Sequence, residues 1–359
     1  MTNRRTFLTT AAAASAAVLS GGFNLASAQT PAGRRREVFV GRKRVKVVDV
    51  HGHFLIPEEI AVVKDTNLAA NVTNTFNGTL VLGPGRIRAM DEAGIDVQVL
   101  SHQGGWWYGL SREPARQLVT IQNEKLAEWC KAHPDRFVGL CSVALQHPDL
   151  AAEQLDEAVR RLGLRGVGIA GHVAGESPSL PKYDPFWAKA EELGVLVFTH
   201  PVGADNVLRE GVMRGRGDMG NIIGNPLETT VFFSRMIFDG ALDRFPRLKI
   251  CGAHAGGYLP SYLGRTDVAC DARPNANCAN KRHPRDYFKD QILADSMVFS
   301  DEGLRHLVAE TGVSQVVFGT DMPYNWPSNV DLILNAKFLS DADKEAILGG
   351  TLVKLLRLT

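Results

Sequence analysis

The sequence predicts an α/β fold, a (β/α)₈ TIM barrel with an insertion after its first strand and extra helices at its C-terminus. Short β-branched strand patterns alternate with helical patterns from residue 45 onward, as in parallel βα units. The chain has 359 residues, 45% of them hydrophobic, which suits a barrel of ordinary size. A doubly wound open sheet is the alternative, but the glycine-rich phosphate turn typical of that fold is missing after the first strand.

The predicted strands are short apolar runs, each followed by a polar residue or a turn. They span residues 45–54, 97–102, 136–143, 166–170, 195–200, 248–254, 292–296 and 315–321. Amphipathic periodicity predicts helices between them, over residues 86–93, 113–132, 150–162, 184–193, 228–242 and 303–311. Residues 55–85 form the predicted insertion, and two helical patterns follow the last strand. We therefore assign residues 45–359 to one barrel.

The N-terminus has the order of an export signal. Arg4-Arg5-Thr6-Phe7-Leu8 is a twin-arginine pattern, an alanine-rich stretch follows, and Ala26-Ser27-Ala28 offers a cleavage site. We predict that residues 1–28 are a twin-arginine signal peptide, recognised by the twin-arginine translocation machinery and removed near Ala28. The mature protein is then periplasmic or secreted, and residues 29–44 form a solvated N-terminal arm.

The net charge bears on the kind of partner, and the cysteine content bears on disulfide formation. The net charge is +1, and it becomes about −1 once the signal with its two arginines is removed, which gives no reason to expect nucleic acid or an anionic membrane as a partner. Of five cysteines, Cys270 and Cys278 lie in a polar loop. In an oxidising compartment they either pair or stay free, and the sequence does not decide between the two.

Two histidines at the end of the first strand carry most of the functional information. His51 and His53 are separated by one residue, so on a strand they point to the same face. Two imidazoles on one face suit a divalent metal ion at the mouth of a barrel. A single histidine at a strand end is more often structural, but a pair with this spacing favours a metal site.

Other ionisable residues follow the ends of the later strands. His200 ends the fifth strand, His254 the sixth and Asp321 the eighth. Each alone could be a core histidine or a turn cap. Together they indicate one site, because the C-terminal ends of barrel strands converge and form the active site of such folds.

These residues and their surroundings resemble the amidohydrolase superfamily. The segments Ala253-His-Ala-Gly-Gly and Gly319-Thr-Asp-Met-Pro are similar to the branch around aminocarboxymuconate-semialdehyde decarboxylase. The resemblance implies that His51, His53, His200 and Asp321 bind one divalent metal ion, zinc or else manganese. It implies that His254 is the catalytic acid or base, with Asp321 counted as catalytic as well as a ligand. The fourth strand has no lysine to bridge a second metal ion.

The resemblance also suggests substrate-binding residues and an assembly. Arg265 matches an arginine that reaches a neighbouring subunit's site and holds a substrate carboxylate, which implies a homodimer; its other interpretation is a surface arginine. Residues 45–85 contain no arginine to match a second one. Trp106 and Trp107 either wall an aromatic pocket or pack in the core. His172 and Asp295 are candidates for orienting metal-bound imidazoles or the substrate.

The first hypothesis is a mononuclear metal-dependent decarboxylase, a carboxy-lyase acting on a small unsaturated or aromatic carboxylic acid. The second is a metal-dependent hydrolase of an ester, lactone or amide within the same superfamily. A non-catalytic metal-binding barrel is the third, and His254 argues against it, because a binding protein has no need of a base beside an open metal.

Overall fold

Eight parallel strands form one sheet in the computed structural model, which describes residues 35–64, 66, 80–102, 107–209 and 211–358. The barrel occupies the second of two units in the chain, Arg34–Thr359. Its strands are paired in chain order: β3 (Val48–Phe54), β4 (Val97–His102), β5 (Phe137–Cys141), β6 (Gly166–Ala170), β7 (Leu196–His200), β8 (Lys249–Gly252), β9 (Ile292–Asp295) and β10 (Val316–Val317). The predicted export signal lies outside the described residues.

The first and last strands meet and close the barrel. Val50 N donates to Phe318 O (2.9 Å) and His53 N donates to Met322 O (2.8 Å). The predicted (β/α)₈ barrel is therefore confirmed. The predicted last strand, residues 315–321, is wrong in length, since only Val316–Val317 is a strand and the chain then turns into the site.

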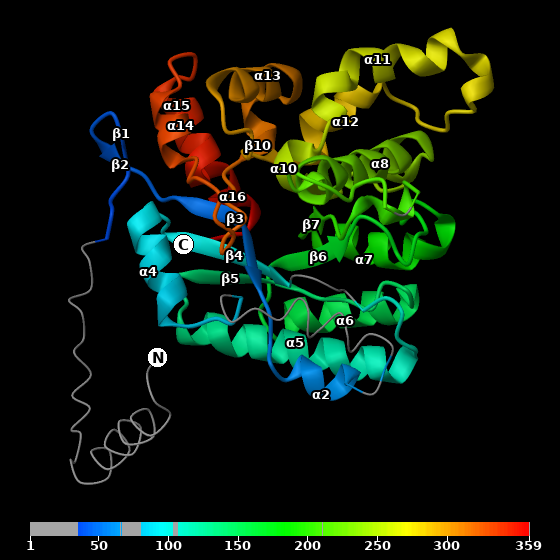
Figure 1. Cartoon of the computed structure of the whole chain (residues 1–359), viewed down its shortest axis with the longest axis horizontal. Coiled ribbons are helices and arrows are strands. Elements are labelled where there is room, and N and C mark those ends of the chain that lie inside the picture. Colours follow the sequence, from blue (N-terminus) through cyan, green and yellow to red (C-terminus); the bar gives the residue numbers. More distant parts are fainter. Residues whose placement is uncertain (1–34, 65, 67–79, 103–106, 210, 359) are drawn as a thin grey trace, which may run out of the picture. The chain divides into compact units, whose positions relative to one another are not determined.

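Helices lie around the outside of the strands (Figure 1). They are α2 (Glu59–Val63), α4 (Pro84–Ala93), α5 (Arg112–Ala132), α6 (Pro148–Arg160), α7 (Asp184–Leu193), α8 (Asn225–Phe238), α9 (Ala241–Arg244), α10 (Ala253–Gly256), α11 (Leu259–Ala272), α12 (Pro284–Asp290), α13 (Asp301–Thr311), α14 (Val330–Asn335), α15 (Asp341–Glu345) and α16 (Thr351–Leu355). Within the insertion, the described residues form α2 and the start of α4. After β10 come α14 and one continuous helical segment made of α15, a π-helical turn (Ala346–Gly350) and α16, in agreement with the two C-terminal helices predicted from the sequence.

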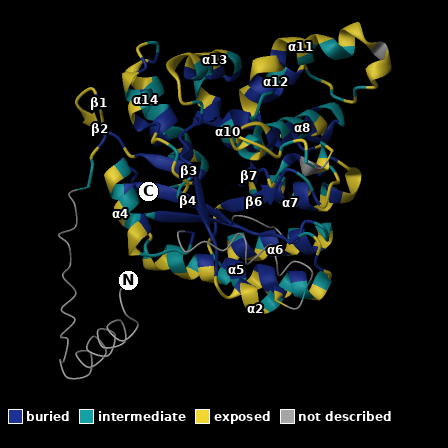
Figure 2. Cartoon of the chain, in the orientation of Figure 1, coloured by how far each residue is buried: buried dark blue, intermediate teal, exposed yellow. Residues whose placement is uncertain are grey.

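Apolar residues form two layers, one inside the barrel and one between the strands and the helices. Figure 2 shows the strands buried and the helices exposed on their outer faces. The inner layer includes Val48, Val99 and Phe198, and Leu352 and Leu356 at the C-terminal helix complete it. Each buried leucine contributes about 1.5–3 kcal/mol by leaving water. The C-terminal segment thus seals the end of the barrel at which the strands begin.

Residues 35–44, the part of the predicted N-terminal arm that the structure describes, pack partly against the barrel and are not wholly solvated as predicted. Residues 39–44 form a hairpin of β1 (Phe39–Val40) and β2 (Lys43–Arg44), and Val38 and Val40 are buried. Arg35 and Arg44 both pair with Asp96. Arg35 and Arg44 therefore anchor the arm to the barrel, because both meet the carboxylate of Asp96 there.

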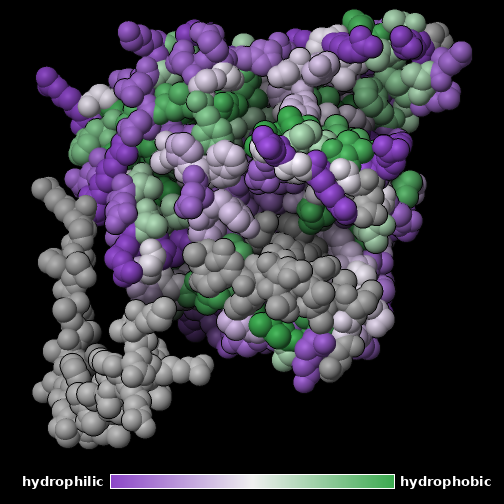
Figure 3. Space-filling view, viewed as in Figure 1, coloured by the Kyte–Doolittle hydropathy of each residue, from purple (hydrophilic) through white to green (hydrophobic). Residues whose placement is uncertain are grey.

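Three further features concern the surface, the cysteines and the hydropathy of the helices. Hydrophilic residues cover much of the described surface visible in Figure 3. Cys270 and Cys278 form a disulfide, which resolves the alternative left open by the sequence. None of the helices in the described ranges is both long and apolar enough to cross a membrane.

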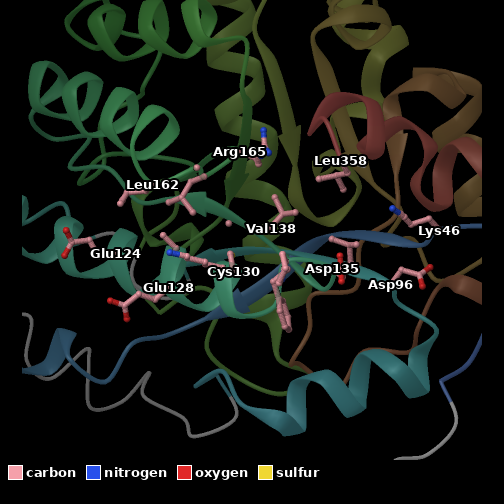
Figure 4. A pocket seen from close by; sticks show the side chains of 18 of the residues that line it. Lys46, Asp96, Glu124, Glu128, Cys130, Asp135, Val138, Leu162, Arg165 and Leu358 are labelled. Atoms are coloured by element: carbon pink, nitrogen blue, oxygen red, sulfur yellow. The ribbon is translucent and has the colours of Figure 1, made fainter.

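A cavity of about 1060 Å³ lies at the end of the barrel where strands begin. Its lining includes Asp96, Val138, Arg165 and Leu358 (Figure 4). Barrel enzymes place their chemistry at the opposite, C-terminal ends of the strands. The functional residues predicted from the sequence are absent from this cavity's lining, so its size does not make it the candidate active site.

Candidate metal centre

Four side chains converge where β3, β7 and β10 end. One potential ligand atom from each of His51, His53, His200 and Asp321 lies within 4.8 Å of the other three, and all four residues are buried. His51 Nε2 and His53 Nε2 are 2.9 Å apart, and Asp321 Oδ1 is 3.2 and 3.0 Å from these two atoms. Atoms this close, with Asp321 Oδ1 buried and lacking a hydrogen bond, fit a common cation. The predicted metal site is confirmed.

An irregularity in β3 turns both histidines into the barrel. Val48 and Val50 face the inner layer, so strict alternation would send His51 and His53 outward. One extra residue changes the phase, because Asp49 pairs with Gln98 whereas Gly52 pairs with Leu100. This β-bulge re-aims the two imidazoles, as bulges do beside active sites. The prediction that they share a face was right, but the bulge was not foreseen.

Hydrogen bonds to the other ring nitrogens orient the imidazoles. His51 Nδ1 lies 2.7 Å from Asp295 Oδ2, and His200 Nδ1 lies 2.7 Å from the carbonyl oxygen of Pro201. When Nδ1 donates to an oxygen, Nε2 keeps its lone pair and can bind a metal ion. Asp295 is therefore the orienting partner suggested by the sequence. His172 is half-buried and its Nδ1 instead accepts from Gly175 N at 2.9 Å.

His254 lies beside the ligand set without belonging to it. Its Nε2 is 3.7 Å from Asp321 Oδ2, and its ring centroid is 5.1 Å from that of His200. Asp295 accepts the backbone N–H groups of His254 (3.0 Å) and Ala255 (2.7 Å). These bonds hold His254 at φ 54°, a left-handed conformation that costs energy in a residue with a Cβ. The turn places an imidazole at the cation site.

The burial and the charges around the site set the protonation states of its ligand residues. Burial disfavours charge on His51, yet Asp321 and Asp295 outweigh it and raise its pKa to about 10. Burial lowers the pKa of His53 to about 4 and lowers that of His200 as well. Burial opposes ionisation of Asp321, but the neighbouring imidazoles hold its pKa well below its usual range. At neutral pH a metal ion thus meets neutral His53 and His200, an anionic Asp321, and one proton on His51 to displace.

Glu228 holds the loops that follow β6 and β7 in place through hydrogen bonds with their backbone N–H groups. Its carboxylate is buried and accepts the backbone N–H groups of Gly203 (2.7 Å) and Val202 (3.1 Å). A Cβ on Gly171 would lie 2.6 Å from Glu228 Oε1, so only glycine lets the loop approach this closely. Burial raises the pKa of Glu228 to about 7, against hydrogen bonds that lower it. Glu228 is structural, and it supports the loop that begins at His200.

This raised pKa predicts a measurable pH dependence of stability. Because the folded pKa is above the unfolded one, protonation of Glu228 stabilises the fold fully below pH 4.5, and that contribution is lost as pH rises through 7. Glu228→Gln should abolish this dependence. Unfolding temperatures of wild type and Glu228→Gln should diverge in favour of the variant between about pH 5 and 8. The exposed Glu153→Gln is the control, and parallel curves for wild type and Glu228→Gln would refute the prediction.

Of the remaining predicted residues, the two that the structure describes, Trp107 and Arg265, lie outside the four-ligand set. Trp107 is buried in an apolar cluster with Leu118 and Leu150, and its indole N–H donates to Glu59 Oε2 (3.2 Å). This placement favours core packing over a pocket wall. Trp106 lies outside the described residues. Arg265 is exposed on α11.

One aromatic residue near the four-ligand set was not predicted from the sequence. The ring of Tyr324 lies 6.0 Å from that of His53, and 38% of the residue is exposed. Its position three residues after Asp321 was the available signal, because the segment after the last strand must pass over the site. Tyr324 supplies an aromatic surface at the mouth of the site.

Comparisons with known proteins agree with this geometry. A profile of the amidohydrolase family matches residues 48–358. The chain is 33% identical to 2-amino-3-carboxymuconate-6-semialdehyde decarboxylase of Dictyostelium discoideum over 76% of each chain. It is 32% identical to gamma-resorcylate decarboxylase of Rhodococcus jostii, over 81% of this chain and 92% of the relative.

A solved structure extends the likeness to three dimensions. Dihydroxybenzoic acid decarboxylase of Polaromonas, with bound manganese and the inhibitor 2-nitroresorcinol, superposes with a TM-score of 0.73 and 25% identity. The superposition covers 88% of this chain and 97% of the other. From the first barrel strand to the last helix, sequence and fold agree with these relatives, and the chain belongs to the amidohydrolase family.

Proposed function

We propose that this protein is a metal-dependent decarboxylase of a small aromatic or unsaturated carboxylic acid. The observation that carries the proposal is the buried set of four ligand residues with His254 beside it. The relatives support the reaction class, because those compared above are decarboxylases of such acids. Among the described residues of the site, none favours a hydrolase over a decarboxylase.

A divalent ion, when bound, supplies positive charge that holds an oxygen of the substrate and stabilises the negative charge on it. His51, His53, His200 and Asp321 would hold it, and manganese in the Polaromonas structure makes manganese as well as zinc a candidate. About one equivalent of metal is expected per chain, since the described residues supply one such set of ligands.

In the proposed reaction, His254 is the proton donor. Its imidazolium gives a proton to the carbon that bears the carboxylate, and the bond between that carbon and the carboxylate then breaks. The electron pair of the broken bond stays with the substrate carbon, CO₂ leaves, and the imidazole takes a new proton from water. Asp321 Oδ2, 3.7 Å from His254 Nε2, stabilises the charged imidazolium.

A substrate panel tests this proposal. The purified protein with metal is offered hydroxylated benzoic acids, among them gamma-resorcylate, alongside aryl esters and lactones. We expect release of CO₂ from one or more of the acids and no hydrolysis. Ester or lactone cleavage without CO₂ release would replace the decarboxylase with a hydrolase.

We further propose that the protein is exported by the twin-arginine route and works in the periplasm or outside the cell. The twin-arginine pattern supports this, as does the disulfide between Cys270 and Cys278, a bond that persists in oxidising compartments. Expression in a bacterial host should yield an exported chain beginning at Gln29. Replacing Arg4 and Arg5 by lysine should keep the full-length chain in the cytoplasm, and unchanged export would contradict the assignment.

We also propose a homodimer in which Arg265 enters the neighbouring site and holds a substrate carboxylate. Arg265 is exposed on α11, where Tyr262 (58% exposed) and Val268 (56%) offer apolar surface to a second copy. Light scattering should give twice the mass of the chain. Arg265→Ala should raise KM without changing the metal content, whereas a monomer with unaltered kinetics would remove Arg265 from the site.

A further inference from the structure

A buried chain of polar side chains runs outside the barrel wall, behind the metal ligands. It connects Arg86 on α4, Gln98 on β4, Asp49 on β3 and Thr320 after β10, and all four are at most 6% exposed. None of them belongs to the set of four residues that would hold the metal ion. Burying a polar group costs free energy unless the group makes hydrogen bonds. The hydrogen bonds that connect these four buried residues are therefore expected to have a structural purpose.

Asp49 joins the two segments that carry three of the four ligands. Its Oδ1 accepts His51 N (3.0 Å) and Thr320 N (3.0 Å), and its Oδ2 accepts the Thr320 hydroxyl (2.6 Å). Thr320 immediately precedes Asp321. One carboxylate therefore fixes the backbone of β3 at His51 relative to the backbone that carries Asp321.

Gln98 and Arg86 complete the chain on the side of His53. Gln98 Nε2 donates to Asp49 Oδ2 (2.8 Å), and Arg86 Nη1 donates to Gln98 Oε1 (2.9 Å). Arg86 Nη2 donates to the carbonyl oxygen of His53 (2.8 Å). The amide of Gln98 is thus oriented at both ends, with its oxygen toward the guanidinium and its nitrogen toward the carboxylate.

The bulge in β3 depends on this arrangement. A Cβ on Gly52, the residue between His51 and His53, would lie 2.5 Å from the side chain of Gln98. Glycine therefore lets Gln98 pass behind the bulge. Asp49 accepts from two backbone N–H groups and from the amide nitrogen of Gln98, and its burial raises the pKa of its carboxyl group.

We propose that Arg86, Gln98, Asp49 and Thr320 are positioning residues that set the spacing of His51, His53 and Asp321 and thereby the affinity for the metal ion. They act through the backbone, in addition to the contacts that Asp295 and Pro201 make with the imidazole rings. The inference concerns metal binding and is independent of the choice of substrate.

Thr320→Val tests the proposal, because it keeps the shape of the side chain and removes the hydroxyl that donates to Asp49. Thr320→Ser keeps the hydroxyl and is the matched control. We expect Thr320→Val to weaken the affinity for Mn²⁺ or Co²⁺ by about 10- to 100-fold, the range known for partners that orient metal ligands. Thr320→Ser should remain near wild type. Affinity is measured by competition with a chelator, and the visible spectrum of bound Co²⁺ reports the ligand geometry.

Gln98→Met gives an independent second test from the other end of the chain, since it separates Arg86 from Asp49. Leu155→Ala, in a buried position on α6, lowers stability without touching these residues and controls for general destabilisation. Weaker metal binding with an altered Co²⁺ spectrum in Thr320→Val and Gln98→Met, but not in Leu155→Ala, would support positioning.

Wild-type affinity and spectrum in both variants would overturn the proposal. Failure of both to fold, while Thr320→Ser folds normally, would also overturn it, because the chain would then be needed for the fold itself. No substrate enters these measurements, so this outcome is separate from the success or failure of the decarboxylase proposal.

Discussion

Replacing His254 by asparagine should lower kcat by about 10²- to 10⁴-fold, the usual contribution of a positioned acid or base. The metal content should stay at wild-type level, because His254 lies outside the four-residue ligand set. Asparagine retains a polar side chain of similar reach but cannot exchange a proton at neutral pH. Its backbone can still donate to Asp295, and asparagine tolerates the left-handed conformation at this position.

Turnover and metal content are measured on the same preparation, by product formation and elemental analysis. Substantial activity in His254→Asn would remove His254 from the proton transfer. Loss of the metal ion would instead make His254 a ligand, which the geometry does not indicate.

Replacing His200 by alanine should reduce bound metal from about one equivalent to near zero and abolish activity, since one of four ligands is lost. The apoprotein should keep its fold, because the barrel core does not depend on the imidazole. The metal-dependent increase in unfolding temperature should disappear, as expected when a ligand that binds only the folded state is lost.

His172→Ala is the matched control for that experiment. His172 also follows a barrel strand, but its Nδ1 accepts from Gly175 N and it lies outside the ligand set. Its replacement should leave the metal content unchanged. Equal loss of metal in both variants would show that the four-ligand assignment is wrong.

Much of the fold and of the ligand set followed from the sequence for a simple physical reason. Parallel strands of a barrel end at the same face, so polar residues that follow the strands converge there. The order of the strands places His200 and Asp321 beside His51 and His53, and the resemblance to the amidohydrolase superfamily separates these four ligands from His254. Asp295 was found in the same way, as a carboxylate at the end of a strand.

Features of the site that depend on strand register and on backbone conformation could not be predicted from the sequence. The bulge that turns His51 inward arises where β3 pairs with β4, and the left-handed turn at His254 depends on hydrogen bonds to Asp295. Trp107 could be read either as a pocket wall or as core, and its burial beside Leu118 and Leu150 favours the core. The arm was expected in solvent because the carboxylates that pair with Arg35 and Arg44 are remote in sequence.

The most direct test of the account uses a substrate whose carboxyl carbon is labelled with carbon-13. Metal-free protein is reconstituted with increasing amounts of Mn²⁺ or Zn²⁺, and labelled CO₂ is measured together with the product acid or phenol. We expect labelled CO₂ release that saturates at about one metal ion per chain and that is absent in His254→Asn. Release that is independent of the metal, or reconstituted protein that only cleaves esters, would contradict it.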